Sequence, residues 1–282
     1  MPLSRLSSWL LLLALPALVL LTVACEEEEE EAPAGTVTPA EAPAAAPELE
    51  DGVLQVGADI AYAPMEFFEE GTENAMGLDI DLAGAIAEEL GVEAEFVNTG
   101  WDGIIPALEA ARFDVIMSSM TITEERQQEI DFVAYFTAGT GILVEAGNPQ
   151  EIETLADLCG KTVAAQVGTI QVEQMEAQNE ECEDEINIVT FDLNPMAVEQ
   201  LRLGRADAVL ADYPVAGYDA ILSEGELEVV GEQFESAPYG VGLRKDSTEL
   251  KAAIEDALEA IMDSGEYDDI LAEWGLEAGS VE

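Results

Sequence analysis

The sequence of 282 residues contains no histidine. This absence excludes Ser-His-Asp and Cys-His nucleophile pairs and removes the usual nitrogen ligand of zinc. The sequence also contains no P-loop and no glycine-rich dinucleotide turn. Asp79 and Asp81 begin like a calcium loop, but Ala83 and Gly84 break that pattern. We therefore expect no catalytic residue, no metal site and no cofactor.

Positive charge is scarce, with 9 Lys and Arg against 61 Asp and Glu and a formal net charge of −52. Nucleic-acid binding needs a basic patch, so we expect no nucleic-acid partner. An anionic group of a ligand would be repelled at long range and would need a local positive pocket. The hydrophobic fraction of 49% is ample for a folded core of about 230 residues.

The N-terminus predicts export. Arg5 precedes an apolar run from Trp9 to Val23, and residues 1–24 form a secretory signal peptide. The segment Leu-Thr-Val-Ala-Cys25 resembles a bacterial lipobox, although Thr22 stands where leucine is preferred. We expect Cys25 to be lipidated; the alternative is an ordinary cleaved signal with an incidental cysteine. Residues 25–49 are rich in Glu, Ala and Pro and predict a stiff tether that holds an extracytoplasmic domain off the membrane.

Only Cys159 and Cys182 remain after Cys25. In an exported protein an even pair of cysteines predicts a disulfide. Two free buried thiols are the alternative.

Apolar periodicity alternates between strand and helix after the tether, which predicts parallel sheets covered by helices on both faces, in two successive lobes. The expected strands are 54–58, 92–97, 114–117, 142–145, 161–165, 186–189, 208–211, 227–230 and 241–243; the expected helices are 79–90, 102–111, 168–178, 195–203, 246–262 with a capping box, and 267–274. Residues 133–141 look irregular. Ligands of such folds bind beyond the carboxyl ends of strands, often between domains.

The stretch from Ser118 to Arg126 follows one of these strands. Small hydroxyl residues lead into a helix that we expect to begin near Thr123, where backbone N–H groups lack partners and the helix dipole is positive. Arg126 can close on the same anion as a planar fork. The stretch therefore predicts a carboxylate receptor, and a solvated arginine at a helix start is the plainer alternative.

Seven segments together resemble the family 3 extracellular solute-binding proteins, the amino-acid receptors of ABC importers with the type II periplasmic-binding fold. They occur in the family's order and are Val56–Pro64, Gly77–Leu82, Trp101–Leu108, Ser118–Arg126, Gln166–Thr169, Gly204–Asp212 and Gly240–Lys245. Each segment alone is weak, but seven in order form a specific signal that covers residues 52–276.

The resemblance implies a role for each matching position. Arg126 would pair with the ligand α-carboxylate, helped by backbone N–H groups near Ser119, Thr121 and Thr169. Asp212 would bind the α-ammonium group. The remaining predicted contacts are Asp59, Tyr62, Trp101, Ser118 and Gln166, of which the two aromatic residues would pack against the ligand. For either aromatic residue alone, a place in the core would be the simpler interpretation.

The resemblance also implies two hinge crossovers, near residues 135–139 and 233–238. Lobe 1 would then comprise residues 50–136 and 237–282, and lobe 2 residues 137–236. Closure of the lobes on an amino acid would present a shape that a membrane permease recognises. We expect a monomer that performs no chemistry.

The ligand is predicted to be a polar or basic L-amino acid, because no Lys or Arg matches a position that would receive a side-chain carboxylate. Arginine, lysine and glutamine are expected ahead of glutamate. Two other classes stay open: a dehydratase-type enzyme on the same fold, and a ligand-sensing receptor domain, in which kinase or channel segments would follow the lobes.

Overall fold

The computed structural model describes residues 46–281, and the predicted signal peptide, Cys25 and most of the predicted tether lie outside this range. Ala46 is buried in a hydrophobic core, and Glu48 forms an ion pair of 3.4 Å with Arg244. Residues 46–49, which the sequence assigns to the tether, therefore belong to the folded body, where Pro47–Leu49 forms the short helix η1. No helix within residues 46–281 is long and apolar enough to cross a membrane.

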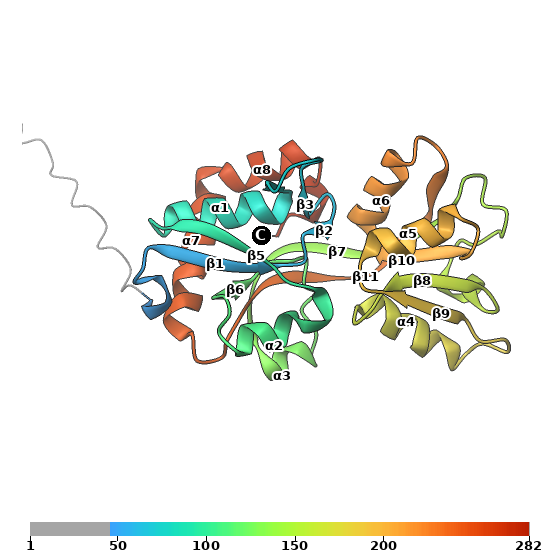
Figure 1. Cartoon of the computed structure of the whole chain (residues 1–282), viewed down its shortest axis with the longest axis horizontal. Coiled ribbons are helices and arrows are strands. Elements are labelled where there is room, and N and C mark those ends of the chain that lie inside the picture. Colours follow the sequence, from blue (N-terminus) through green and yellow to red (C-terminus); the bar gives the residue numbers. More distant parts are fainter. Residues whose placement is uncertain (1–45, 282) are drawn as a thin grey trace, which may run out of the picture. The chain divides into compact units, whose positions relative to one another are not determined.

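One sheet of eight strands runs through the structure in the order β5-β1-β6-β11-β7-β10-β8-β9 (Figure 1). Its strands are β1 (Val53–Ala58), β5 (Glu93–Asn98), β6 (Val115–Ile116), β7 (Asp131–Glu145), β8 (Thr162–Gln166), β9 (Asn187–Phe191), β10 (Ala208–Asp212) and β11 (Leu227–Leu243). β1 pairs in parallel with β5 and β6, and β8 pairs in parallel with β9 and β10. The two parallel groups are joined by β7 and β11, which are antiparallel to each other. This arrangement confirms the predicted α/β fold with two lobes and two crossovers.

Lobe 1 is built on the group β5-β1-β6. Its other elements are β2 (Ala61–Tyr62), β3 (Glu66–Phe68), β4 (Ala75–Met76), α1 (Leu78–Glu89), η2 (Trp101–Gly103), α2 (Ile104–Glu109), α3 (Arg126–Glu129), α7 (Thr248–Ser264), α8 (Glu266–Trp274) and η4 (Glu277–Gly279). Figure 1 shows α1, α7 and α8 on one face of the strands and α2 and α3 on the other. Each face has its own core: Leu54 and Val56 pack with α1 and α7, whereas Ile116 and Phe113 pack with α2.

Lobe 2 is built on the group β10-β8-β9. Its helices are η3 (Leu155–Leu158), α4 (Ile170–Asn179), α5 (Asn194–Arg202) and α6 (Tyr213–Leu222). Successive residues of β10 serve opposite faces, as a strand requires. Ala208 and Leu210 join the core under α4, whereas Val209 joins the core under α5 and α6. Helices on both faces therefore bury β10 and nearly all of β8, which explains the apolar runs in these two strands.

The two crossovers are continuous strands, so the prediction of irregular structure over residues 133–141 was wrong. β7 runs without interruption from Asp131 to Glu145, and β11 runs beside it with register shifts on either side of Phe234. Gly139 and Gly141 weaken the sequence signal for a strand in this segment. At Gly139 a side chain would come within 2.6 Å of the Phe234 carbonyl oxygen, so glycine permits the close approach of the two crossovers.

Two further expectations about helices need correction. α6 was not predicted, because Pro214 and Gly217 lower the apparent helix propensity of its segment; in the structure the proline occupies the first turn, where it is tolerated. The predicted capping box at the start of α7 does not form. Ser247 is the N-cap, and its buried hydroxyl has no hydrogen-bond partner among the described residues.

A disulfide joins Cys159 and Cys182, as predicted. Cys159 precedes β8, and Cys182 follows α4, so the bond ties the first strand of lobe 2 to the end of its first helix. The alternative interpretation, in which these two cysteines are free thiols, is therefore wrong.

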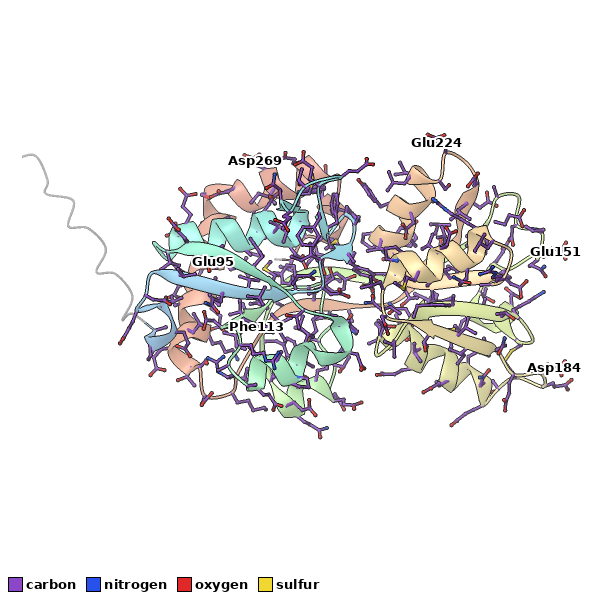
Figure 2. The ribbon with its side chains drawn as sticks, viewed as in Figure 1. Glu95, Phe113, Glu151, Asp184, Glu224 and Asp269 are labelled. Carbon is purple, nitrogen blue, oxygen red and sulfur yellow. A yellow bond between two sulfur atoms is a disulfide. The ribbon has the colours of Figure 1, made fainter. Side chains whose placement is uncertain are left out.

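Most acidic residues lie on the surface. Figure 2 shows Glu151, Asp184, Glu224 and Asp269 at the outer edges of the ribbon, and these four residues and Glu95 are all exposed. The excess negative charge is thus mostly solvated, as expected for a charge that affects solubility more than fold.

Candidate functional site

A cavity of about 320 Å³ lies between the two lobes. Its lining consists of Asp59, Tyr62, Glu66, Trp101, Ser118, Ser119, Thr121, Arg126, Gln166, Thr169, Ile170, Gln171 and Asp212. All ten ligand contacts that the sequence predicts are in this set.

The sheet explains why residues so distant in sequence meet. Asp59 directly follows β1, and Ser118 lies two residues after the end of β6. Gln166 and Asp212 are the last residues of β8 and β10. Parallel strands place their carboxyl ends at one edge, and side chains at those ends converge. The cavity is therefore built from the edges of both lobes.

Arg126 is held by three groups at one side of the cavity. Its guanidinium donates to the Thr121 carbonyl oxygen at 2.8 Å and to the Gly168 carbonyl oxygen at 3.4 Å. The guanidinium carbon also lies 5.2 Å from the centre of the Trp101 ring, within cation–π range. Burial lowers the pKa of Arg126, and the nearby carboxylates of Glu173 and Asp212 oppose that effect. The side chain is a fixed positive group in a cavity that otherwise contains acids.

The helix α3 begins at Arg126, three residues later than the expected start near Thr123. Thr123 instead accepts a hydrogen bond from the Arg126 N–H at 3.2 Å. The N–H groups of Thr121 and Thr169 have no hydrogen-bond acceptor among residues 46–281. Both residues line the cavity, and Thr169 is the N-cap of α4. An anion in the cavity would meet these donors and the positive end of a helix dipole.

Asp212 is the second charged group of the cavity. Its two carboxylate oxygens accept hydrogen bonds from the Tyr62 hydroxyl at 3.0 Å and from Nε2 of Gln171 at 2.9 Å. Burial raises the pKa of Asp212 to about 6, and the hydrogen bonds from Tyr62 and Gln171 limit the rise. The carboxylate is thus ionised at neutral pH and positioned by partners from both lobes.

Asp59 and Gln166 meet across the lobes. The Gln166 amide donates to Oδ2 of Asp59 at 2.6 Å, and also to the Asp192 carbonyl oxygen at 3.0 Å. The backbone N–H of Asp59 donates to the Ser118 hydroxyl at 3.0 Å. Burial raises the pKa of Asp59, and the bond from Gln166 opposes the rise.

Glu66 lines the cavity although the sequence did not select it. The Ser118 hydroxyl donates to Oε1 of Glu66 at 2.5 Å. Glu66 also adjoins Asp79, a second fully buried carboxyl group, and burial together with their mutual repulsion raises the pKa of Glu66 well above its usual range. Burial raises the pKa of Asp79 to about 7. Each carboxyl group of the pair therefore opposes the ionisation of the other.

Ser119 contributes differently from the expectation. Its backbone N–H, expected to face a ligand carboxylate, donates instead to Oδ2 of Asp79 at 2.6 Å. Its hydroxyl lies 3.3 Å from the same oxygen. Among the three expected backbone donors, those of Thr121 and Thr169 are thus available, and that of Ser119 is occupied.

The position of Glu66 depends on a backbone contact that no periodic pattern reveals. The N–H of Asp79 donates to the Met65 carbonyl oxygen at 2.9 Å, which docks the β2–β3 hairpin on the start of α1. A side chain at Gly77 would collide with the same Met65 carbonyl. Gln171 and Ile170, the other unexpected lining residues, follow Thr169 in the first turn of α4 and could have been found from that spacing.

No group of three or more acidic or cysteine ligands that could hold a metal ion occurs in the described part of the chain. The site offers one cation, the carboxyl groups of Asp59 and Asp212, free backbone donors and flat aromatic surface. Such a site can bind a small zwitterion.

Two parallel groups of strands joined by two crossovers, with a cavity between the lobes at the strand ends, define a type II periplasmic binding protein. The chain belongs to the bacterial extracellular solute-binding proteins, family 3, whose sequence pattern matches residues 54–277.

Similar proteins bind amino acids, as far as their names state. The arginine-binding protein ArgT of Corynebacterium glutamicum is 34% identical over 236 residues, which cover 81% of this chain and 76% of that protein. The L-cystine-binding protein TcyJ of Escherichia coli is 34% identical over 228 residues, covering 80% and 83%. The crystal structure of the ancestral amino acid-binding protein AncCDT-1, a precursor of cyclohexadienyl dehydratase, has 40% identity and a TM-score of 0.73, covering 80% of this chain and 96% of that one.

Proposed function

We propose that this protein is the extracytoplasmic substrate-binding component of an ABC importer and that it captures a basic or polar L-amino acid, with L-arginine foremost. One observation supports this most strongly: the cavity holds a single cation, Arg126, together with the carboxylates of Asp212 and Asp59. Family membership and the named relatives support the transport role.

The α-carboxylate and the α-ammonium group of the amino acid would each bind to a residue of opposite charge. Arg126 and the free N–H groups of Thr121 and Thr169 would receive the α-carboxylate through charge-assisted hydrogen bonds. Asp212 would receive the α-ammonium group, in an orientation fixed by Tyr62 and Gln171. Trp101 would cover the ligand, because its indole is held by a 2.8 Å bond to the Gly168 carbonyl oxygen of the other lobe.

The ligand side chain would then face Asp59 and Glu66. Asp59 can pair with a guanidinium or ammonium group, and a protonated Glu66 can donate a hydrogen bond. A second carboxylate on the ligand would find no cation, because Arg126 is the only Lys or Arg in the lining. Burying it unpaired would cost several kcal/mol. Glutamate, aspartate and cystine should therefore bind worse than arginine, lysine or glutamine.

Closure of the lobes would accompany binding. Tyr62, Asp59 and Trp101 of lobe 1 already make hydrogen bonds to Asp212, Gln166 and Gly168 of lobe 2. A ligand that pairs with Arg126 on one lobe and Asp212 on the other favours the closed state by its differential affinity for it. We assign residues 50–136 and 237–282 to lobe 1 and residues 137–236 to lobe 2, with the hinges near residues 135–139 and 233–238.

A thermal-shift screen of the twenty amino acids, with ornithine and opines added, tests the proposal. A ligand that binds only the native state raises the unfolding temperature. Arginine, lysine or ornithine should give the largest shifts. The absence of a shift with every compound would contradict the proposal.

The proposal also covers where the protein is located in the cell. We place it outside the cytoplasm as a monomer, anchored by a lipid on Cys25. A Cys25→Ala variant expressed in a bacterial host should partition into the soluble fraction, whereas the wild type should remain with membranes. Equal partitioning would show that Cys25 is not the anchor.

A dehydratase on this fold would need an acid or base group in the cavity, and burial raises the pKa of three lining carboxyl groups, those of Asp59, Glu66 and Asp212. We assign Asp59 and Asp212 to the cationic groups of the ligand, which leaves Glu66 for such a role. Glu66 is instead tied to Ser118 and adjoins Asp79, which suits a fixed hydrogen-bond donor better than a group that cycles its proton. We expect no turnover of prephenate or arogenate.

A further inference from the structure

A continuous series of hydrogen bonds leaves the cavity at Asp212 and ends on the β11 crossover. Nε2 of Gln171 donates to Asp212 at 2.9 Å and to the Thr140 hydroxyl at 3.2 Å. The Thr140 hydroxyl donates to Oε1 of Gln174 at 2.8 Å. Nε2 of Gln174 then donates to Oε2 of Glu235 at 2.8 Å. We call this series the hinge network.

The donors and acceptors of the hinge network are matched at every step. Gln171, Thr140 and Gln174 each donate toward Glu235, and the Gln171 amide also donates in the opposite direction to Asp212, so both ends are carboxylates that only accept. Hydrogen bonds arranged in series polarise and strengthen one another. Thr140 has no exposed surface, and Gln171 and Gln174 are buried too, so water does not compete for the central bonds.

The network reaches both crossovers. Thr140 lies in β7, where its neighbours across the sheet are Asp212 of β10 and Phe234 of β11. Glu235 lies in β11 within the register shift between Phe234 and Ala237, and it has a positive φ of 50°. This bent segment is held to β7 by a second contact, in which the Gly139 N–H donates to Oε1 of Gln233 at 3.0 Å.

We propose that Thr140 and Gln174 are positioning residues for the ligand: through the hinge network they fix the orientation of the Asp212 carboxylate to the bent segment of the second hinge at Glu235. None of Thr140, Gln174 and Glu235 lines the cavity. The inference rests on the proposed function, because it assigns to Asp212 the ligand ammonium group. Affinity for the amino acid then depends on an exposed glutamate outside the site.

Glu235 gives the cleanest test, because it is exposed and its truncation leaves the core intact. Glu232 is the matched control: it lies in the same strand, is also exposed, and makes no side-chain hydrogen bond among the described residues. Calorimetric titration with L-arginine should show roughly tenfold weaker binding for Glu235→Ala and less than a twofold change for Glu232→Ala. Glu235→Gln keeps an acceptor oxygen and should bind within about threefold of the wild type.

The central hydroxyl is tested by a pair of conservative variants. Thr140→Ser keeps both hydrogen bonds and should bind arginine nearly as well as the wild type, whereas Thr140→Val should bind about tenfold more weakly. In the double variant Thr140→Val with Glu235→Ala the losses should be less than additive, because both break one network.

Equal affinities for Glu235→Ala and Glu232→Ala, or additive losses in the double variant, would overturn the inference while leaving the proposed function intact. A wild-type protein that binds none of the amino acids would overturn the proposed function, and this inference with it, before any variant is compared.

Discussion

The hydroxyl of Tyr62 donates a hydrogen bond to a carboxylate oxygen of Asp212 and accepts one from the backbone N–H of the same residue. Both distances are 3.0 Å. The two residues are 150 positions apart and belong to different lobes. A phenol that bonds a carboxylate in this way stabilises the ionised form of the acid and fixes its orientation. The contact therefore joins lobe closure to the charge state of the group that we assign to the ligand ammonium.

Binding should depend on the protonation of Asp212. Its pKa is raised to about 6, chiefly by burial. Protonation removes the negative partner of the ammonium group, so affinity should be constant above pH 7 and fall as pH drops through about 6. Tyr62→Phe removes a bond that lowers this pKa, and the midpoint should move to higher pH. Titrations with arginine from pH 5 to 8 measure both midpoints; identical profiles for the two proteins would contradict the assignment.

Arg126→Ala should abolish most amino-acid binding without unfolding the protein. Truncating one partner of a desolvated charge pair costs about 2–5 kcal/mol, or roughly 30-fold to several thousand-fold in affinity. Arg112→Ala is the control, because Arg112 is an exposed arginine of the same lobe and lies outside the cavity. Calorimetry would compare the two, and an affinity for Arg126→Ala equal to that of Arg112→Ala would refute the carboxylate role.

The buried Asp79 should make the ligand-free protein less stable as pH rises. Its folded pKa of about 7 lies above the unfolded value, so the native state binds more protons and the free energy of unfolding falls between about pH 4 and 7. Asp79→Asn should therefore be more stable than the wild type at pH 8, by about 2 to 4 kcal/mol. Urea unfolding at pH 5 and pH 8 measures this difference.

Asp184→Asn controls for the loss of one surface charge, since Asp184 is exposed. A stabilisation at pH 8 as large in Asp184→Asn as in Asp79→Asn would show that total charge, and not the buried pair, governs the effect.

The bond between Cys159 and Cys182 should stabilise lobe 2 without shaping the cavity. It closes a loop with a sequence separation of 23, for which chain entropy predicts about 3 kcal/mol. The double variant Cys159→Ser, Cys182→Ser should lower the unfolding free energy by that amount and leave arginine affinity within twofold. Unchanged stability, measured by urea unfolding under non-reducing conditions, would contradict this account.

The sequence predicted the strand-end residues of the site well because position at a strand end is a local property. Asp59, Gln166 and Asp212 each stand directly after a mostly apolar segment. Such a segment can be recognised as a buried strand without knowing which strands lie beside it. Glu66 could not be found in this way. The short strands of its hairpin have no periodicity of their own, and tertiary contacts such as the one between Met65 and Asp79 hold the hairpin against α1.

Tertiary contacts also stabilise the two elements that were not predicted from the sequence, the middle of β7 and the helix α6. Gly139 and Gly141 weaken the strand signal of β7, yet each admits a close neighbour: the Phe234 carbonyl in one case and Tyr213 in the other. The same packing stabilises α6, whose Val215 and Ala216 are fully buried. Burial of this kind overrides local propensity.

The central claim is that one cation and an excess of buried carboxylates select a basic or polar L-amino acid. Competitive calorimetry with L-arginine, L-lysine, L-glutamine, L-glutamate and L-cystine at pH 7.5 tests it most directly. Arginine, lysine or glutamine should bind at least tenfold more tightly than glutamate and cystine, because a second ligand carboxylate would be buried without a cation. Tighter binding of glutamate or cystine than of all three others would contradict the account.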